Sequence, residues 1–277
     1  MTHYTLAELH QQFCRVQRNG FGWLEAQTDA PRAVVLIHGV TGGKDDMLPL
    51  AERYLALGYA VYCPDLVGHG DSAMIAVRDF ADLGRWFRDA VNEIGVTPEL
   101  IVANSYSSAV VYSYLQQGFL PEQTSVILGC PTPIIAWFSR VLDRIGQVLP
   151  RRLMWFVYNT SLVQKIRVFY LYRGETSASR AWLVESEKRK YHYIAPDVSV
   201  TLTGLLSSDN PFQGAILPSD IQRRVTVVLG QRDNVIAPGA REFLHKILPD
   251  ATFVDAGPAG HILHFEAIDA LVAKRGA

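Results

Sequence analysis

Short, mostly apolar runs recur along the chain, and they constrain its fold more than any other feature. The run at residues 33–37 reads Ala-Val-Val-Leu-Ile. Similar runs stand at residues 60–63, 100–103, 125–128, 225–229 and 252–254. An apolar run of this length without alternation is typical of a strand that is buried on both faces of a parallel sheet. The sequence therefore predicts a sheet of at least six such strands.

Helical patterns separate these runs. Residues 79–94 carry apolar side chains at helical spacing, and Gly95 ends the pattern. A similar pattern covers about residues 46–57 and ends at Gly58. Alternating strands and helices predict an α/β fold in which helices cover both faces of a doubly wound, mostly parallel sheet.

One long segment breaks this alternation. Residues 132–216 are helix-like and poor in strand signals, so we expect them to form a cap or lid inserted into a core of residues 1–131 and 217–277. At the start of the chain, residues 13–16 and 21–25 flank an Asn-Gly turn signal, which predicts a hairpin. A chain of 277 residues that is 49% hydrophobic can bury one large core.

Charge and cysteine content exclude several classes of function. The formal net charge is −1, so the chain carries no overall signal for a nucleic-acid partner. The first residues lack a basic segment followed by an apolar run, so we expect no signal peptide and a cytoplasmic location. Cys14, Cys63 and Cys130 form no C-x-x-C pair and are expected to be buried free thiols. No cluster has metal-ligand spacing, so neither a metal nor another cofactor is expected.

Ser105 is the first candidate for chemistry, because it directly follows the run at 100–103 and precedes a helical stretch at 109–115. A serine at such a turn exposes its hydroxyl at the sheet edge, with a helix N-terminus behind it. The usual pattern is G-x-S-x-G, and here Ala103 and Ser107 replace both glycines. Taken alone, such a serine is more often a helix N-cap.

Two backbone N–H groups are candidates for stabilising the charge that a serine attack creates. Val40 lies in a loop with Gly39 and Gly42 after the first buried run, and Tyr106 follows Ser105. A tetrahedral intermediate needs two preorganised donors about 3 Å from its charged oxygen. A purely structural glycine-rich turn is the alternative. A phosphate loop is not supported, because the G-x-x-x-x-G-K-[ST] pattern is absent.

An acid and a histidine follow the last two strands. Asp233 lies beyond the run at 225–229, and His261 lies beyond the run at 252–254. Parallel sheets gather reactive groups at the carboxyl ends of their strands. Singly, these residues are more often turn or helix-start residues. Together with Ser105 they predict a Ser–Asp–His triad.

These motifs resemble the α/β-hydrolase fold superfamily, nearest to its serine esterase, lipase and monoacylglycerol-lipase-like members. The matching segments are His38-Gly39, residues 64–72, the turn around Ser105, residues 230–238 and residues 260–266. The resemblance implies Ser105 as nucleophile, His261 as general base, Asp233 as the acid that orients the histidine, and an oxyanion hole of Val40 and Tyr106. It also implies that His69 shapes its loop. His264 is expected to be a packing or rim residue.

The implied reaction is acyl transfer through an acyl-enzyme that water releases. His261 would take the proton of Ser105 as it attacks an ester carbonyl. A serine at this position argues against the chemistry of the haloalkane dehalogenases and epoxide hydrolases of the superfamily. Three alternatives stay open: a carbon–carbon bond hydrolase of a ring-cleavage product, a thioesterase or acyltransferase, and a non-catalytic ligand-binding member of the fold.

The first part of the predicted cap is rich in aromatic and basic residues and contains one acid, Asp143. The aromatic residues are Trp137, Phe138, Trp155, Phe156, Tyr158, Phe169, Tyr170 and Tyr172, and the basic residues are Arg140, Arg144, Arg151, Arg152, Lys165, Arg167 and Arg173. This composition suits peripheral contact with an anionic membrane. Packing of the aromatic side chains onto the core is the alternative. In either case the expected partner is a small-molecule acyl ester with an apolar chain, and the sequence leaves the oligomeric state open.

Overall fold

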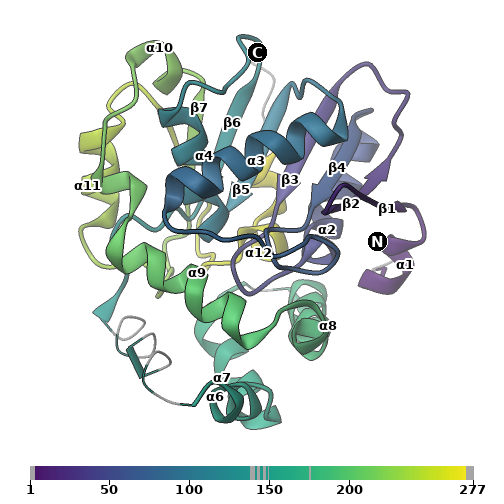
Figure 1. The fold of residues 1–277 in the computed structure, drawn as a ribbon, viewed down its shortest axis with the longest axis vertical. Helices are drawn as coiled ribbons and strands as arrows, with labels where there is room; N and C mark the ends of the chain where they lie inside the picture. Colours follow the sequence, from purple (N-terminus) through teal and green to yellow (C-terminus); the bar gives the residue numbers. More distant parts are fainter. Residues whose placement is uncertain are drawn as a thin grey trace.

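An eight-stranded sheet forms the centre of the molecule (Figure 1). The computed structural model describes residues 4–137, 141, 144–145, 148, 150–174 and 176–272. The strands are β1 (Cys14–Arg18), β2 (Phe21–Ala26), β3 (Ala33–Ile37), β4 (Ala60–Pro64), β5 (Leu100–Asn104), β6 (Ser125–Gly129), β7 (Val225–Leu229) and β8 (Thr252–Asp255). Their order across the sheet is β1-β2-β4-β3-β5-β6-β7-β8. All six predicted apolar runs are strands.

The strands from β3 to β8 pair in parallel, and β1 and β2 form the expected antiparallel hairpin at one edge. Asn19 and Gly20 at its turn both have positive φ angles, as a tight two-residue hairpin turn requires. The prediction of a mostly parallel α/β sheet is confirmed. The prediction of three buried thiols is wrong for Cys14, which is exposed because β1 is an edge strand.

The apolar runs are explained by burial on both faces of the sheet. In β3, Val34 and Leu36 belong to one core cluster, and Val35 and Ile37 belong to the other. All four side chains are fully buried. Successive side chains of a strand point to opposite faces, so a strand with helices on both sides must be apolar at every position.

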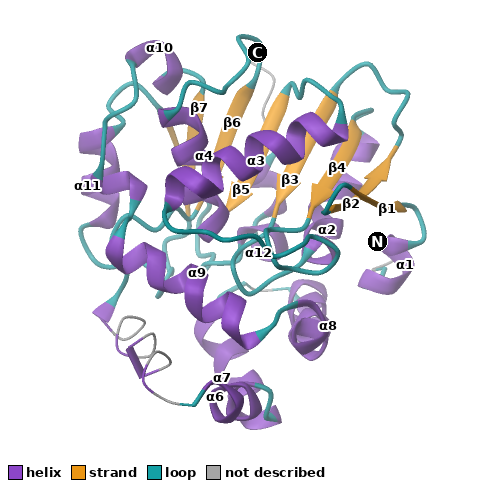
Figure 2. Ribbon diagram, viewed as in Figure 1, coloured by secondary structure: helices purple, strands orange, loops and turns teal. Residues whose placement is uncertain are grey.

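Helices cover both faces of the sheet (Figure 2). The helices outside residues 132–216 are α1 (Leu6–His10), α2 (Leu48–Ala56), α3 (Phe80–Ile94), α4 (Tyr106–Gln116), α10 (Ser219–Gln222), α11 (Ala240–Ile247) and α12 (Leu263–Glu266). Helices α3, α4 and α11 bury their apolar residues in one core cluster, and α1, α2 and α12 bury theirs in the other. Among the described residues, no helix combines the length and the apolarity that crossing a membrane requires.

The chain between β6 and β7 is mostly helical where the structure describes it. It contains α6 (Arg151–Tyr158), α7 (Ser161–Leu171), α8 (Ser177–Tyr193) and α9 (Pro196–Ser208), and none of its described residues lies in a strand of the sheet. Figure 1 shows these four helices together beyond one end of the strands. This is the end at which the candidate site residues lie.

Candidate active site

Ser105 is the single residue between β5 and α4. Its φ and ψ angles are 64° and −125°, which a residue with a side chain rarely adopts. Such strain persists only where the surrounding structure holds it. Here the Ser105 N–H donates a hydrogen bond to Gly129 O at 2.8 Å, which ties the turn to the neighbouring strand β6. The strand-to-helix turn expected around Ser105 is therefore present.

Ala103 and Ser107, which replace the two usual glycines, are both fully buried. Ser107 Oγ accepts a hydrogen bond from Asn104 N at 2.9 Å and donates one to Ile37 O at 2.9 Å. The hydroxyl at this position is therefore fully engaged with the ends of β3 and β5. The turn forms with small residues in place of both glycines.

The structure brings Ser105, Asp233 and His261 together. Ser105 Oγ lies 2.6 Å from His261 Nε2, and His261 Nδ1 lies 2.7 Å from Asp233 Oδ2. The other oxygen, Asp233 Oδ1, accepts a hydrogen bond from Val235 N at 2.8 Å. A neutral imidazole with its proton on Nδ1 satisfies both contacts, because Nδ1–H can donate to the carboxylate while Nε2 accepts from the serine hydroxyl.

The electrostatics of this trio favour an ionised acid. Burial by itself would raise the pKa of Asp233, but the charge of His261 and its hydrogen bond outweigh burial and lower that pKa. Cys130 lies beside them. Its Sγ atom, a carboxylate oxygen of Asp233 and a ring nitrogen of His261 all lie within 4.8 Å of one another. Burial, reinforced by the charge of Asp233, raises the pKa of the Cys130 thiol well above its usual value. Because metals bind the thiolate, this arrangement fits a protonated thiol better than a metal ligand.

The backbone around His261 is held from two sides. Asn104 Nδ2 donates a hydrogen bond to His261 O at 3.2 Å. A Cβ atom added at Gly230 would lie 2.4 Å from Ala259 O, so a glycine is needed where the chain beyond β7 passes this close to the histidine loop. Asn104 was not predicted as a site residue, although it lies inside the turn pattern next to Ser105.

The loop with Gly39 and Val40 passes directly against the serine. A Cβ atom added at Gly39 would lie 3.4 Å from Ser105 Cβ. Among the described residues, the Val40 N–H has no hydrogen-bond acceptor. The N–H of Tyr106, the first residue of α4, has no acceptor within its helix. Both groups therefore meet a requirement for oxyanion donors, and that role stays a prediction.

Two buried histidines hold this loop. His38 Nε2 accepts a hydrogen bond from Leu66 N at 3.0 Å, and its Nδ1 lies 2.8 Å from Gly39 O. His69 Nε2 lies 2.7 Å from Val40 O. Burial lowers the pKa of both rings, which favours their neutral forms. His69 thus contacts the loop that carries the candidate oxyanion donor.

A cavity of about 60 Å³ adjoins Ser105 and His261. Its apolar wall consists of Leu171, Leu183, Ile262 and Phe265, and its polar wall includes Thr41, Asp46, Lys190 and His264. This space holds only a few water molecules. His264 is buried there, in agreement with a packing role. Lys190 was missed by the sequence reasoning because it lies in an ordinary charged stretch of helix α8 without any motif.

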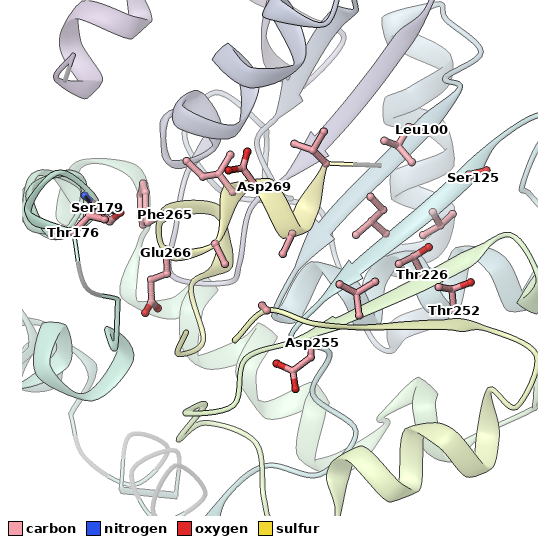
Figure 3. Close-up of a pocket in the computed structure, with 18 of the residues that line it drawn as sticks. Leu100, Ser125, Thr176, Ser179, Thr226, Thr252, Asp255, Phe265, Glu266 and Asp269 are labelled. Atoms are coloured by element: carbon pink, nitrogen blue, oxygen red, sulfur yellow. Dashed lines mark hydrogen bonds between the residues drawn. The ribbon is translucent and has the colours of Figure 1, made fainter. Parts of the chain in front are cut away.

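A wider cavity of about 940 Å³ lies elsewhere (Figure 3). It is lined by Leu100, Ser125 and Thr252, the first residues of their strands, and by Thr176 and Ser179. Ser105, Asp233 and His261 do not line it. Volume alone would select this cavity, but reactive groups of parallel sheets lie at the carboxyl ends of strands. We therefore take the smaller cavity as the candidate active site.

Two curated relatives are lipases by name. The chain is 26% identical over 137 residues to a protein named monoacylglycerol lipase from Mycolicibacterium smegmatis (strain ATCC 700084 / mc(2)155), an alignment that covers 44% of this chain and 49% of that relative. It is 22% identical over 243 residues to Lipase 1 from Psychrobacter immobilis, covering 87% of this chain and 74% of that relative. The chain thus spans about half the length of the first of these relatives.

Solved structures and a family match agree on the fold. The 2-hydroxy-6-oxo-6-phenylhexa-2,4-dienoate hydrolase of Rhodococcus sp. strain RHA1 superposes with a TM-score of 0.69 at 18% identity, covering 94% of this chain and 95% of that one. An identity this low is evidence of the fold alone. The sequence also matches the model of the alpha/beta hydrolase family over residues 34–274. The chain therefore belongs to the alpha/beta hydrolase family.

Proposed function

We propose that the protein is a serine hydrolase that cleaves a carboxylic ester of an apolar acyl chain through an acyl-enzyme. The observation that carries this proposal is the unbroken hydrogen-bonded chain from Ser105 through His261 to Asp233. A histidine that contacts both a serine hydroxyl and a buried carboxylate is arranged to remove the serine proton. Lipases among the relatives support a hydrolase of this class.

The proposed reaction has two halves. His261 Nε2 takes the proton of Ser105 as Oγ attacks the ester carbonyl, and Asp233 stabilises the imidazolium that forms. The Val40 and Tyr106 N–H groups receive the oxyanion. Collapse of the intermediate breaks the ester bond, and the imidazolium gives its proton to the leaving alcohol. Water, activated in turn by His261, then releases the acid from Ser105.

The proposed substrate is a small-molecule ester with an apolar acyl chain, such as a monoacylglycerol. Leu171 and Leu183 from the helices between β6 and β7 supply part of the apolar wall beside Ser105. We propose that residues 132–216 act as a cap on a core of residues 1–131 and 217–277. Since the cavity holds only about 60 Å³, a long chain requires these helices to move. A cytoplasmic location stays a prediction.

We also propose that the cap makes peripheral contact with membranes through α6 and α7. Phe156 on α6 and Leu162 and Phe169 on α7 expose 72%, 67% and 74% of their surface. Leu162, Ile166 and Phe169 follow one another at helical spacing and are all exposed, so one face of α7 is apolar and open. Exposed apolar surface of this kind marks an interaction site.

The charge around this face favours anionic lipid. Arg152 and Lys165 are exposed on the same two helices, and residues 150–174 include no acid. Aromatic side chains with neighbouring basic residues bind at the boundary between headgroups and acyl chains. Of the other predicted cap residues, Phe138, Arg140 and Asp143 lie outside the described residues, and the side chains of Arg151, Trp155 and Tyr158 are not described.

The test of the function is hydrolysis of p-nitrophenyl esters from acetate to palmitate, using wild type beside Ser105→Ala. We expect serine-dependent hydrolysis that increases with chain length, and a fluorophosphonate label that maps to Ser105 rather than to Ser107 or Ser108. Full activity of Ser105→Ala would refute the nucleophile. Activity that peaks at acetate would refute the apolar acyl chain.

A carbon–carbon bond hydrolase is the second candidate. The likeness in fold to a dienoate hydrolase over 94% of this chain leaves this reaction open. The same enzyme preparations should therefore also be given 2-hydroxy-6-oxo-6-phenylhexa-2,4-dienoate. Serine-dependent cleavage of that compound without ester hydrolysis would replace the ester proposal by this one.

A further inference from the structure

Buried charges lie between helix α8 and the active-site loop. Lys190 and Glu187 of α8 form an ion pair and are only 6% and 1% exposed. Arg167 of α7 pairs with Glu187 as well. Lysine and glutamate are almost never this buried unless they are paired. The cluster joins α7 and α8, and its Lys190 lines the cavity beside Ser105.

Lys190 extends from this cluster to the loop. Its Nζ donates a hydrogen bond to Thr41 Oγ1 at 3.3 Å, and Thr41 directly follows Val40. Val40 O belongs to the peptide bond between Val40 and Thr41, and it lies 2.7 Å from His69 Nε2. The chain directly after the candidate oxyanion donor is therefore bonded at Val40 O by His69 of the core and at the Thr41 side chain by Lys190 of α8.

The far end of the same loop is also tied to this charge. Asp46 Oδ2 accepts a hydrogen bond from Gly43 N at 3.3 Å. Burial raises the pKa of Asp46 to about 6, while the charge of Lys190 acts in the opposite direction. Lys190 thus holds Thr41 by a hydrogen bond, and its charge acts on the ionisation of Asp46.

A buried ion pair is weak evidence for stability, because apolar residues of similar volume often stabilise a protein equally well. A role in positioning the active-site loop explains the buried charge of Lys190 better than a role in stability does. An oxyanion hole works only when its donors are fixed about 3 Å from the developing charge, and a misplacement of about 1 Å can reduce the rate about a hundredfold. The Lys190 ammonium, which contacts Thr41, lies close to one of these donors, the Val40 N–H.

We propose that Lys190 is a positioning residue, which holds the Val40 N–H in the oxyanion hole through its hydrogen bond to Thr41. The proposal rests on the serine hydrolase function proposed above. It makes helix α8 a part of the catalytic machinery as well as a wall of the cavity. A movement of the cap helices that admits a long acyl chain must then leave the Lys190–Thr41 contact in place or restore it before the ester is attacked.

The test is a double-mutant cycle of Thr41→Val and Lys190→Met, measured as kcat and KM on one p-nitrophenyl ester. Each single variant should lower kcat about tenfold or more while KM changes little. The reason is that the donors of the oxyanion hole bind the transition state more strongly than they bind the ester substrate. The double variant should be no slower than the slower single variant, since both changes break one contact. Lys188→Met, at an exposed position of the same helix, is the matched control and should keep the wild-type kcat.

Thr41→Val keeps the Lys190–Glu187 pair and nearly the same volume, so it decides the question if Lys190→Met fails to fold. A wild-type kcat in Thr41→Val overturns the proposal. Additive losses in the double variant overturn it as well, as does an effect confined to KM. Absence of serine-dependent turnover in the wild type is a different result, which overturns the proposed function and this inference with it.

Discussion

Ser107 Oγ joins two strands of the sheet, because it lies 2.9 Å from Ile37 O at the end of β3 and 2.9 Å from Asn104 N at the end of β5. The residue that replaces the usual glycine thus adds a link that glycine could not make. Gly39, two residues beyond Ile37, passes against Ser105. The same link therefore helps to fix the loop of the candidate oxyanion hole relative to the serine.

Ser107→Ala should lower the free energy of unfolding by about 1–3 kcal/mol, because it removes the partner of the buried Asn104 N–H. Urea unfolding measures this loss. Ser125→Ala, at the exposed first residue of β6, is the control and should change stability by less than about 0.5 kcal/mol. Equal stabilities of the two variants would mean that the link has no energetic value.

Asp233→Asn should reduce kcat by roughly 10⁴, since an amide in this position favours the wrong tautomer of His261. Side-chain volume is nearly unchanged, so the thermal midpoint should stay close to that of the wild type. The control is Asp255→Asn, at the exposed carboxyl end of β8, which should leave kcat unchanged. A small effect of Asp233→Asn would remove this residue from the proposed triad.

His264 should make the protein sensitive to acid. Burial lowers the pKa of His264 to about 3, with the charges of Lys190 and His261 adding to the effect. The ring is neutral in the folded state and takes up a proton on unfolding below its ordinary pKa of 6.5. Its contribution to stability is therefore complete above about pH 6.5 and is lost as the pH falls towards 3.

His264→Phe should weaken this dependence by up to about 1.4 kcal/mol per pH unit between pH 6 and 4. Urea unfolding of both proteins at several pH values measures the difference. His38 and His69, whose pKa values are also lowered by burial, act in the same direction and remain in both proteins. A stability difference between the two proteins that does not vary with pH would assign the whole effect to packing.

Phe156→Ser and Phe169→Ser should each weaken binding to phosphatidylglycerol vesicles by a factor of about ten to a hundred, because burying a phenylalanine side chain is worth about 1.5–3 kcal/mol. Hydrolysis of a soluble short ester should not change. Binding should weaken as salt is raised, since the attraction of Arg152 and Lys165 to the lipid is screened. Vesicle cosedimentation measures both effects.

Ile216→Ser is the control for vesicle binding, because Ile216 is exposed outside α6 and α7. It should bind vesicles as the wild type does. Equal losses from all three substitutions, or no loss from any, would contradict contact through α6 and α7.

Much of the fold could be predicted because its signals are local. A run such as Ala33–Ile37 must be apolar throughout, since both faces of β3 are covered. Residues 79–94 read as a helix, and α3 covers Phe80–Ile94 between the Asp79 cap and Gly95. The expectation for Cys14 failed because exposure of an edge strand depends on the order of strands in space, which composition does not encode.

The residues at the carboxyl ends of the strands could be identified from local patterns alone, and among them are Ser105, Asp233 and His261, whose side chains meet in the structure. This was possible because a parallel sheet brings the ends of its strands to one edge whatever the details of packing. The contact of Lys190 with Thr41, 149 positions apart, and that of Asn104 with His261, 157 positions apart, become visible only in the folded chain. Such contacts follow from how helices settle on the sheet, which depends on shape complementarity among many side chains rather than on any local pattern.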